Sequence, residues 1–182
     1  MALSATIYRL KISLSDVDRG VYQELDLRLA QHPSETMHHM LTRVIAYCLC
    51  YEEGIAFTRG LSVTDEPALW VKDLQGNLRV WIDVGTPSTE RLHKASKACP
   101  RVVVFTQNDP ELLRPAGRAK PIHRASEIEV YALDAALLNT LESVIERNAT
   151  WSLAHTEGVL YVTCGETSVS APITRYSLVD ED

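Results

Sequence analysis

The stretch Leu78–Pro87, LRVWIDVGTP, has the clearest strand pattern in the chain and contains an acidic residue near its end. Its apolar residues alternate with the others at a period of two, which predicts a β-strand. Both faces of this strand are mostly apolar, so we expect it to be covered on both sides. Asp83 then needs a partner, because a buried carboxylate is costly unless a cation, a hydrogen-bond donor or a metal ion pairs with it.

The segments on either side of this strand predict an α/β core. Residues 67–73 predict a strand that a short turn joins to it. Thr86 and Pro87 predict the start of a helix, because threonine is a favoured N-cap and proline is favoured at the first helical position. Residues 101–106, RVVVFT, predict a central strand buried on both faces. Strand, helix and strand over 78–106 are long enough for a right-handed parallel crossover.

The N-terminal part of the chain predicts a β-hairpin followed by a helix. Alternation over residues 5–14 and 21–30, with turn residues between them, predicts two antiparallel strands. Pro33 and Ser34 indicate the start of a helix. An apolar stripe at helical spacing then continues this helix to about residue 51.

The C-terminal part predicts one more strand and helix, and then a β-meander. Residues 127–133 predict the strand, and Asp134 predicts the start of the helix. We therefore expect a mixed α/β (α+β) fold with a core over residues 1–148, a meander appendage over 149–176 and a flexible tail over 177–182.

Composition and charge exclude several classes of protein. The 182 residues are 46% hydrophobic, which suits a full core, and no run approaches the roughly 18 apolar residues of a membrane span. The opening sequence MALSATIYRLKI lacks a secretory apolar region, so we expect a cytoplasmic protein with reduced cysteines and no membrane partner. The net charge of −6 argues against a broad surface for duplex nucleic acid. Gly-x-Ser-x-Gly and P-loop motifs are absent.

Acidic residues gather around the predicted core. Glu35 lies near the start of the first helix, Asp65 and Glu66 precede the strand at 67–73, and Asp83 lies near the end of the next strand. Carboxylates at one end of a sheet are how proteins hold Mg²⁺, which prefers hard oxygen ligands and a substrate phosphate. This grouping of acids is therefore suited to Mg²⁺, with Mn²⁺ as a substitute.

Four short segments are similar to the bacterial YaeQ family: RLAQHPSET, DEPALW, WIDVGTP and ERLHKA. The resemblance runs over nearly the whole chain. It implies membership of the nuclease superfamily whose motif is Pro-Asp, a spacer, and Asp/Glu-x-Lys, known as PD-(D/E)XK. A restriction-endonuclease-like mixed sheet flanked by helices is the fold that this resemblance implies.

Asp83 matches the acid of Asp/Glu-x-Lys, but this chain has Gly85 where the motif has its lysine. The motif places a lysine there because that position shares the strand face of the acid and can orient water. Members of the superfamily can move the lysine to the following helix, so Lys94 is the candidate replacement, with Arg91 one turn earlier. Arg91 flanks the apolar stripe of that helix more closely, but it stays protonated and cannot act as a base.

The Pro-Asp element also differs, because Pro67 is followed by Ala68. The second metal acid would then be Asp65 or Glu66, and the register of the hairpin decides between them. A three-residue turn gives Asp65 the face of the strand acid, whereas a two-residue turn gives that face to Glu66. Both turns fit the sequence.

Each candidate also has a purely structural interpretation. Asp83 can accept amide hydrogen bonds at the entry to the helix, and Lys94 and Arg91 can form a solvated helix face. Glu35 matches the helix glutamate of many such nuclease sites, but its helical angle points away from the apolar stripe. A first-turn acid favoured by the helix dipole is the simpler interpretation of Glu35.

Two hypotheses about function follow. In the first, the protein is a Mg²⁺-dependent nuclease or phosphodiesterase: Asp83 with Asp65 or Glu66 binds the metal, Glu35 assists through water, and Lys94 orients water or the developing charge. Its partner is then nucleic acid. In the second, the nuclease scaffold is catalytically impaired and acts as a binding or regulatory module, with a protein as a further kind of partner. The missing lysine and the acidic charge favour the second hypothesis, and the retained acids favour the first.

Overall fold

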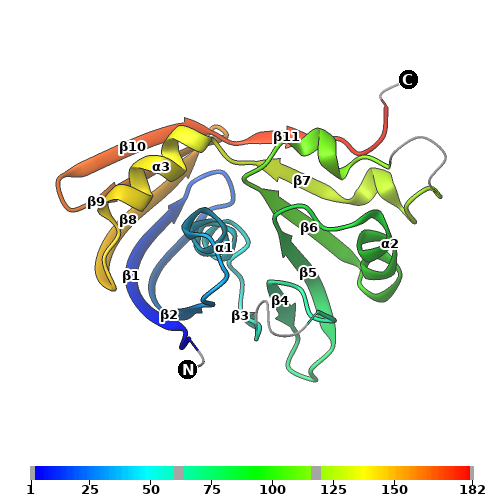
Figure 1. The fold of residues 1–182 in the computed structure, drawn as a ribbon, viewed down its shortest axis with the longest axis horizontal. Coiled ribbons are helices and arrows are strands. Elements are labelled where there is room, and N and C mark those ends of the chain that lie inside the picture. The colour runs from blue at the N-terminus through cyan, green and yellow to red at the C-terminus, as the bar shows by residue number, and fades with distance from the viewer. Residues whose placement is uncertain (1–2, 60–63, 116–119, 181–182) are drawn as a thin grey trace. The chain divides into compact units, whose positions relative to one another are not determined.

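The computed structural model describes residues 3–59, 64–115 and 120–180 (Figure 1). The chain divides into two compact units, which we call unit 1 (Met1–Tyr51 with Leu133–Ile173) and unit 2 (Glu52–Ala132 with Thr174–Asp182). Each unit contains one mixed β-sheet, and the described residues form three α-helices. None of the helices in these ranges is long and apolar enough to cross a membrane.

Unit 1 is a five-stranded sheet with two helices. The strand order is β10-β9-β8-β1-β2, and all neighbours are antiparallel except β1 and β8, which pair in parallel. The elements are β1 (Thr6–Asp16), β2 (Val21–Gln31), α1 (Met37–Leu49), α3 (Ala135–Val144), β8 (Asn148–Thr156), β9 (Val159–Cys164) and β10 (Thr167–Pro172).

The core of unit 1 lies between the sheet and its helices. Every second residue of β1 is buried, as the alternating sequence predicts. Helix α1 lies in the hollow of the curved sheet, and α3 packs against α1 and β10 (Figure 1). The buried stripe of α1 is Met40, Leu41, Val44, Ile45 and Cys48.

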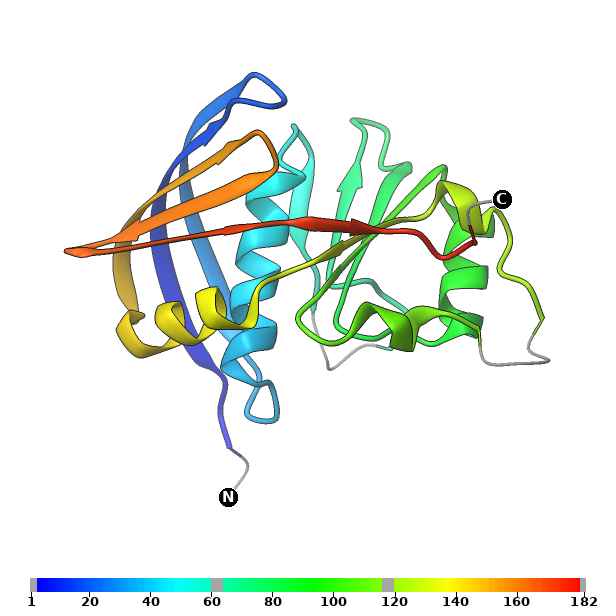
Figure 2. The same ribbon diagram turned by 90° about the horizontal axis from the view of Figure 1, so that it is seen from above.

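Unit 2 is a six-stranded sheet in the order β11-β7-β6-β5-β4-β3. Its central strands β5, β6 and β7 are parallel, and the outer pairs are antiparallel. Helix α2 connects β5 to β6 and packs against β6 (Figure 2). The elements are β3 (Ile55–Phe57), β4 (Leu69–Lys72), β5 (Leu78–Val84), α2 (Thr89–Ala98), β6 (Arg101–Thr106), β7 (Glu129–Ala132) and β11 (Thr174–Tyr176).

The arrangement of the C-terminal strands differs from the predicted appendage. The meander β8-β9-β10 forms, but β8 pairs with β1, so it extends the sheet of the N-terminal hairpin and belongs to unit 1. Strand β11 instead pairs with β7 in unit 2. Leu178 is buried in the core of unit 2, so residues 177–180 are not a flexible tail, and the predicted tail at 181–182 lies outside the described residues. Such long-range pairings leave no local pattern in the sequence.

The helix starts were predicted with mixed success. Asp134 caps α3 as predicted, since its carboxylate accepts a hydrogen bond from the Leu137 amide. The other two starts were wrong by two or more residues: Thr36 rather than Ser34 caps α1, and Ser88 rather than Thr86 caps α2. In both cases a second hydroxyl residue follows the predicted cap, and either residue satisfies the same capping rule.

Candidate functional site

Asp83 is buried near the end of β5 and has both carboxylate oxygens occupied by protein donors. Arg91 of α2 donates from Nε to Oδ2 at 2.9 Å and from Nη2 to Oδ1 at 3.0 Å. Trp81 Nε1 donates to Oδ2 at 2.9 Å. A two-point arginine–carboxylate contact of this kind is the strong form of an ion pair. The partner that the buried strand acid requires is therefore a guanidinium.

Arg91 also contacts the segment that precedes β4. Its Nη1 donates to the carbonyl of Thr64, and its Nη2 donates to the carbonyl of Glu66. The guanidinium carbon lies 5.4 Å from the centre of the Trp81 ring, within cation–π range. Arg91 thus gathers a carboxylate and two backbone carbonyls around one positive charge. Its backbone is fixed at the start of α2, where its amide donates to the Ser88 hydroxyl at 3.1 Å.

Asp83 lies one residue beyond the last pair of the β4–β5 hairpin. The pairing of β4 with β5 ends where Leu69 faces Ile82, and extending this register by one residue beyond β4 would set Ala68 opposite Asp83. Ala68 follows Pro67, which makes it the position of the aspartate in Pro-Asp. Neither Asp65 nor Glu66 lies in β4, so the strand-face argument that we used to choose between them does not apply.

Both predicted turns of this hairpin were wrong. Lys72 pairs with Leu78, so the loop contains residues 73–77, and the register then shifts between Val71 and Lys72. Asp73 organises this longer loop, because its carboxylate accepts hydrogen bonds from the amides of Gln75 and Asn77. The Asp73 loop and the irregular pair that follows it shift the register of β4 against β5 by one residue. The alternation of apolar residues in the sequence is the same with or without this shift, so it could not be predicted.

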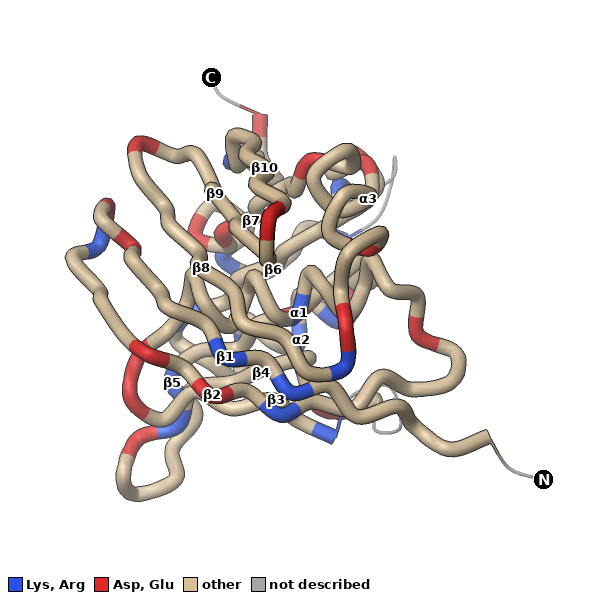
Figure 3. Tube along the Cα trace, turned by 90° about the vertical axis from the view of Figure 1, so that its left-hand side faces the viewer, with Lys and Arg blue, Asp and Glu red and all other residues tan. Residues whose placement is uncertain are grey.

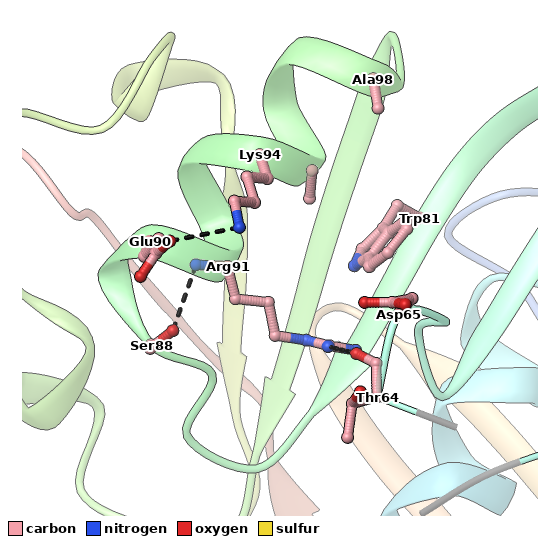
Figure 4. Close-up of a pocket in the computed structure, with 9 residues that line it drawn as sticks. Thr64, Asp65, Trp81, Ser88, Glu90, Arg91, Lys94 and Ala98 are labelled. Carbon is pink, nitrogen blue, oxygen red and sulfur yellow. Dashed lines mark hydrogen bonds and ion pairs between the residues drawn. The ribbon is translucent and has the colours of Figure 1, made fainter. Parts of the chain in front are cut away.

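Glu66 is held by a second arginine. Arg59 Nη2 donates to Glu66 Oε1 at 2.7 Å, and these hydrogen bonds from Arg59 lower the pKa of the Glu66 carboxyl. Glu66 is therefore a charged acid with a partner. Asp65 differs, because it lines a pocket next to Trp81 (Figure 4).

This pocket has a volume of about 460 Å³ and lies between α2, β5 and the 64–65 segment (Figure 4). Trp81, Ala95 and Ala98 provide its apolar surface. Lys94 also lines it, but its ammonium pairs with Glu90 at 3.2 Å and both side chains are exposed. The remaining lining residues are Thr64, Asp65, Ser88 and Arg91. The structure thus brings Asp65, Arg91 and Lys94 to one pocket beside Asp83.

Gly85 has a backbone that disfavours the lysine of the motif. Its φ is +95°, in the region that glycine adopts readily and residues with a side chain rarely adopt. Its amide donates to the carbonyl of Phe105 at 2.9 Å, which fixes it against the next strand. The absence of lysine at this position is therefore built into the local backbone.

Glu35 belongs to unit 1, where it is buried and paired. Arg43 donates from Nη2 to Oε1 at 2.6 Å and from Nε to Oε2 at 2.8 Å, and His39 Nδ1 also contacts Oε2. Burial alone would raise the pKa of Glu35, but the hydrogen bonds from His39 and Arg43 outweigh it and lower the pKa. The predicted helical angle of Glu35 was wrong, because the residue precedes the Thr36 cap and is outside the helix.

Three of the four acidic side chains predicted for the site are held by arginines. Among residues 3–59, 64–115 and 120–180, no group of three or more His, Cys, Asp and Glu side chains is arranged to hold one. Asp83, Glu66 and Glu35 instead each have an arginine. Sequence reasoning missed Arg59 and Arg43. A signal exists for Arg43, which is a charged residue inside the apolar stripe of α1, whereas nothing local indicates Arg59.

These features define a mixed α+β protein with two mixed sheets and a strand-end carboxylate held by a helix arginine. Residues 1–173 match the family described as YaeQ protein, and the chain belongs to the YaeQ family. The "Uncharacterized protein YaeQ" of Escherichia coli (strain K12) is 30% identical over 178 residues, covering 97% of this chain and 98% of the relative. The protein of the same description from Salmonella typhi is also 30% identical, over the same shares.

Two solved structures of YaeQ proteins share this fold. The protein from Xanthomonas axonopodis pv. citri is 30% identical with a TM-score of 0.87, covering 96% of this chain and 99% of that chain. The protein from Pseudomonas syringae is 31% identical with a TM-score of 0.83, covering 97% of each chain.

Proposed function

We propose that this protein has a PD-(D/E)XK-type nuclease fold that has lost metal-dependent hydrolysis and acts as a binding module. The observation that supports this most is the contact between Arg91 and Asp83, which occupies both oxygens of the acid that a metal would need. The guanidinium has taken the role of the cation: it neutralises Asp83 and collects the carbonyls of Thr64 and Glu66.

Two further features support the loss of hydrolysis. Mg²⁺ in such sites is held by one or two carboxylates together with water and substrate phosphate, and the residue that extension of the β4–β5 register sets opposite Asp83 is Ala68, which has no carboxylate. The general-base lysine has no place at Gly85, where φ is positive. Lys94 pairs with Glu90 and not with Asp83, so its ammonium is directed along the exposed side of α2.

The binding site in this proposal is the pocket beside Arg91. Its volume is within the range of sites for small ligands. The Trp81 ring with Ala95 and Ala98 suits a planar ring, because aromatic stacking tolerates many ring types. Asp65 and Ser88 then supply polar groups for the edges of the ligand. We assign a nucleobase or nucleoside as the ligand class.

The first experiment measures hydrolysis. Labelled single- and double-stranded DNA and RNA are incubated with Mg²⁺ or Mn²⁺ and either the wild type or Asp83→Asn. We expect both proteins to give the same background. Cleavage by the wild type that disappears in Asp83→Asn would overturn the proposal in favour of a metal-dependent nuclease.

The second experiment measures binding in the pocket. Nucleosides are titrated by calorimetry into the wild type, Trp81→Ala and Trp70→Ala. We expect saturable binding that Trp81→Ala loses and that Trp70→Ala, the matched control on β4, retains. A titration without saturation in the wild type would contradict the assignment of the ligand class.

A further inference from the structure

The outer face of the unit 1 sheet contains a charged and aromatic surface that the pocket in unit 2 does not involve. Alternate residues of β1 and β2 are buried, and the residues between them are exposed on the opposite face. Basic and acidic positions both lie along β1 and β2 (Figure 3). Arg9 of β1 faces Arg28 of β2. One pair further along this face Lys11 faces Asp26, and the pair after that is Ser13 with Glu24. We call the basic part, which consists of Arg9, Lys11 and Arg28, the arginine patch.

Two like charges face each other directly in the arginine patch. Arg9 of β1 is the register partner of Arg28 of β2, and both are exposed. Like charges directly opposite in an antiparallel pair are destabilising. Within the described part of the chain, none of the twelve ion pairs includes Arg9, Lys11 or Arg28. An anion placed over the patch would relieve this repulsion.

Aromatic residues lie on the same face, further along the strands. Tyr22 faces Ser15, Ser15 is in register with Ala154 of β8, and Ala154 faces Tyr161 of β9. Both tyrosines are exposed. They are separated by three strand spacings, or about 14 Å, with small residues between them. Each ring is therefore a separate flat platform.

The distance between the two features suits an extended polymer. Residues 9 and 15 of β1 are six residues apart along one strand, which is about 20 Å. A ligand that contacts the arginine patch and Tyr22 must be at least that long, contain anionic groups and present rings for stacking. Single-stranded nucleic acid has all three properties.

We propose that this face binds single-stranded nucleic acid, with phosphates on the arginine patch and bases stacked on Tyr22 and Tyr161. Arginine is suited to phosphate because its guanidinium offers several fixed donors. A duplex suits the face less well, because its bases are stacked inside and its binding needs a broader basic surface than three side chains. This inference is independent of what the pocket in unit 2 binds.

The test is fluorescence anisotropy with labelled single-stranded oligonucleotides at several salt concentrations. Arg9→Ala/Arg28→Ala should lower the slope of log Kd against log salt by about 1.4, because each phosphate contact with a single strand contributes about 0.7. The control, Arg79→Ala/Lys97→Ala, removes the same charge from exposed positions of unit 2 and should leave the slope unchanged. Tyr22→Ala and Tyr161→Ala should each weaken binding at least about fivefold through lost stacking.

Three results would overturn the inference. The first is a wild type that does not bind the oligonucleotides. The second is an equal change of slope in the two double variants, which would indicate non-specific charge. The third is weaker oligonucleotide binding by the double arginine variant with unchanged binding by both tyrosine variants, which would indicate a surface that binds anions of any kind. Circular dichroism of each variant establishes that it is folded.

Discussion

Two predicted site acids ended in the same kind of contact but in different surroundings. Glu35 pairs with Arg43 in unit 1, where the side chains are 1% and 5% exposed. Asp83 pairs with Arg91 in unit 2, where they are 5% and 29% exposed. The first pair is closed to solvent, whereas the second reaches a pocket through its arginine.

The difference in solvent exposure suggests different roles for the two pairs, one in stability and one in function. In a fully buried ion pair the two charges can be compensated only by each other. Removing one partner therefore leaves a buried charge that water cannot solvate, which destabilises the folded state. A pair at a pocket can lose part of its arginine contact to water or to a ligand at lower cost. We therefore interpret Glu35 as a structural residue of unit 1 and Asp83 with Arg91 as the centre of the candidate site.

The largest expected effect is the loss of the closed pair. Arg43→Ala leaves Glu35 without its main partner and should lower the free energy of unfolding by about 3–5 kcal/mol. Urea unfolding followed by circular dichroism measures this. A smaller decrease in the free energy of unfolding for Arg43→Ala than for Arg91→Ala would contradict the distinction between the closed and the open pair.

A smaller loss is expected from the open pair. Arg91→Ala removes two hydrogen bonds from Asp83 and should lower the free energy of unfolding by about 1–3 kcal/mol, since water can reach the vacated position. Asp83→Asn/Arg91→Ala should recover part of that loss, because the uncompensated charge is gone. A double variant less stable than Arg91→Ala would show that the ion pair is not the main contribution of Arg91.

The closed pair also predicts a dependence of stability on pH. The pKa of Glu35 is lower in the folded protein than its usual value, so its stabilisation is present above the unfolded pKa of about 4.3 and is lost as pH falls through the folded pKa. Glu35→Gln should flatten this acidic part of the stability profile. Urea midpoints measured from neutral pH to pH 3 test it, and an unchanged profile would contradict the assignment.

The smallest effect is expected from the exposed pair Glu90–Lys94. Lys94→Ala should change the free energy of unfolding by no more than about 0.5 kcal/mol, because both side chains are solvated neighbours on one helix. The same urea titration measures it. A loss comparable to that of Arg91→Ala would show that Lys94 has a partner besides Glu90.

The parts of the fold that could be predicted from sequence are those with a local pattern. Alternation identified the β1–β2 hairpin, and the continuous β-branched run identified the central strand β6. The parallel pairing of β1 with β8 has no local signal and was missed. The short strand β3 was missed for a related reason, since three residues are too few for a period to be recognised.

The candidate site was predictable in its acids but not in their partners. Asp83 was identified from its place at a strand end, and Arg91 was named with it, but as part of a catalytic set rather than as a cation bound to the acid. The identity of the residue opposite Asp83 depends on a register that a single irregular pair in the hairpin changes. The register could not be predicted from the sequence, and so the sequence could not identify Ala68 as the residue that an extension of the β4–β5 register sets opposite Asp83.

Calorimetric titration of Mn²⁺ is the most direct test of the claim that Arg91 has replaced a metal ion. The proteins are the wild type, Asp83→Asn and Ala68→Asp/Arg91→Ala, which adds an acid beside Asp83 and removes the guanidinium, together with the same double variant containing Asp83→Asn. We predict no binding heat from the wild type, binding by the double variant, and loss of that binding in the triple variant. Binding of Mn²⁺ by the wild type that Asp83→Asn abolishes would contradict the claim and restore the metal-dependent nuclease.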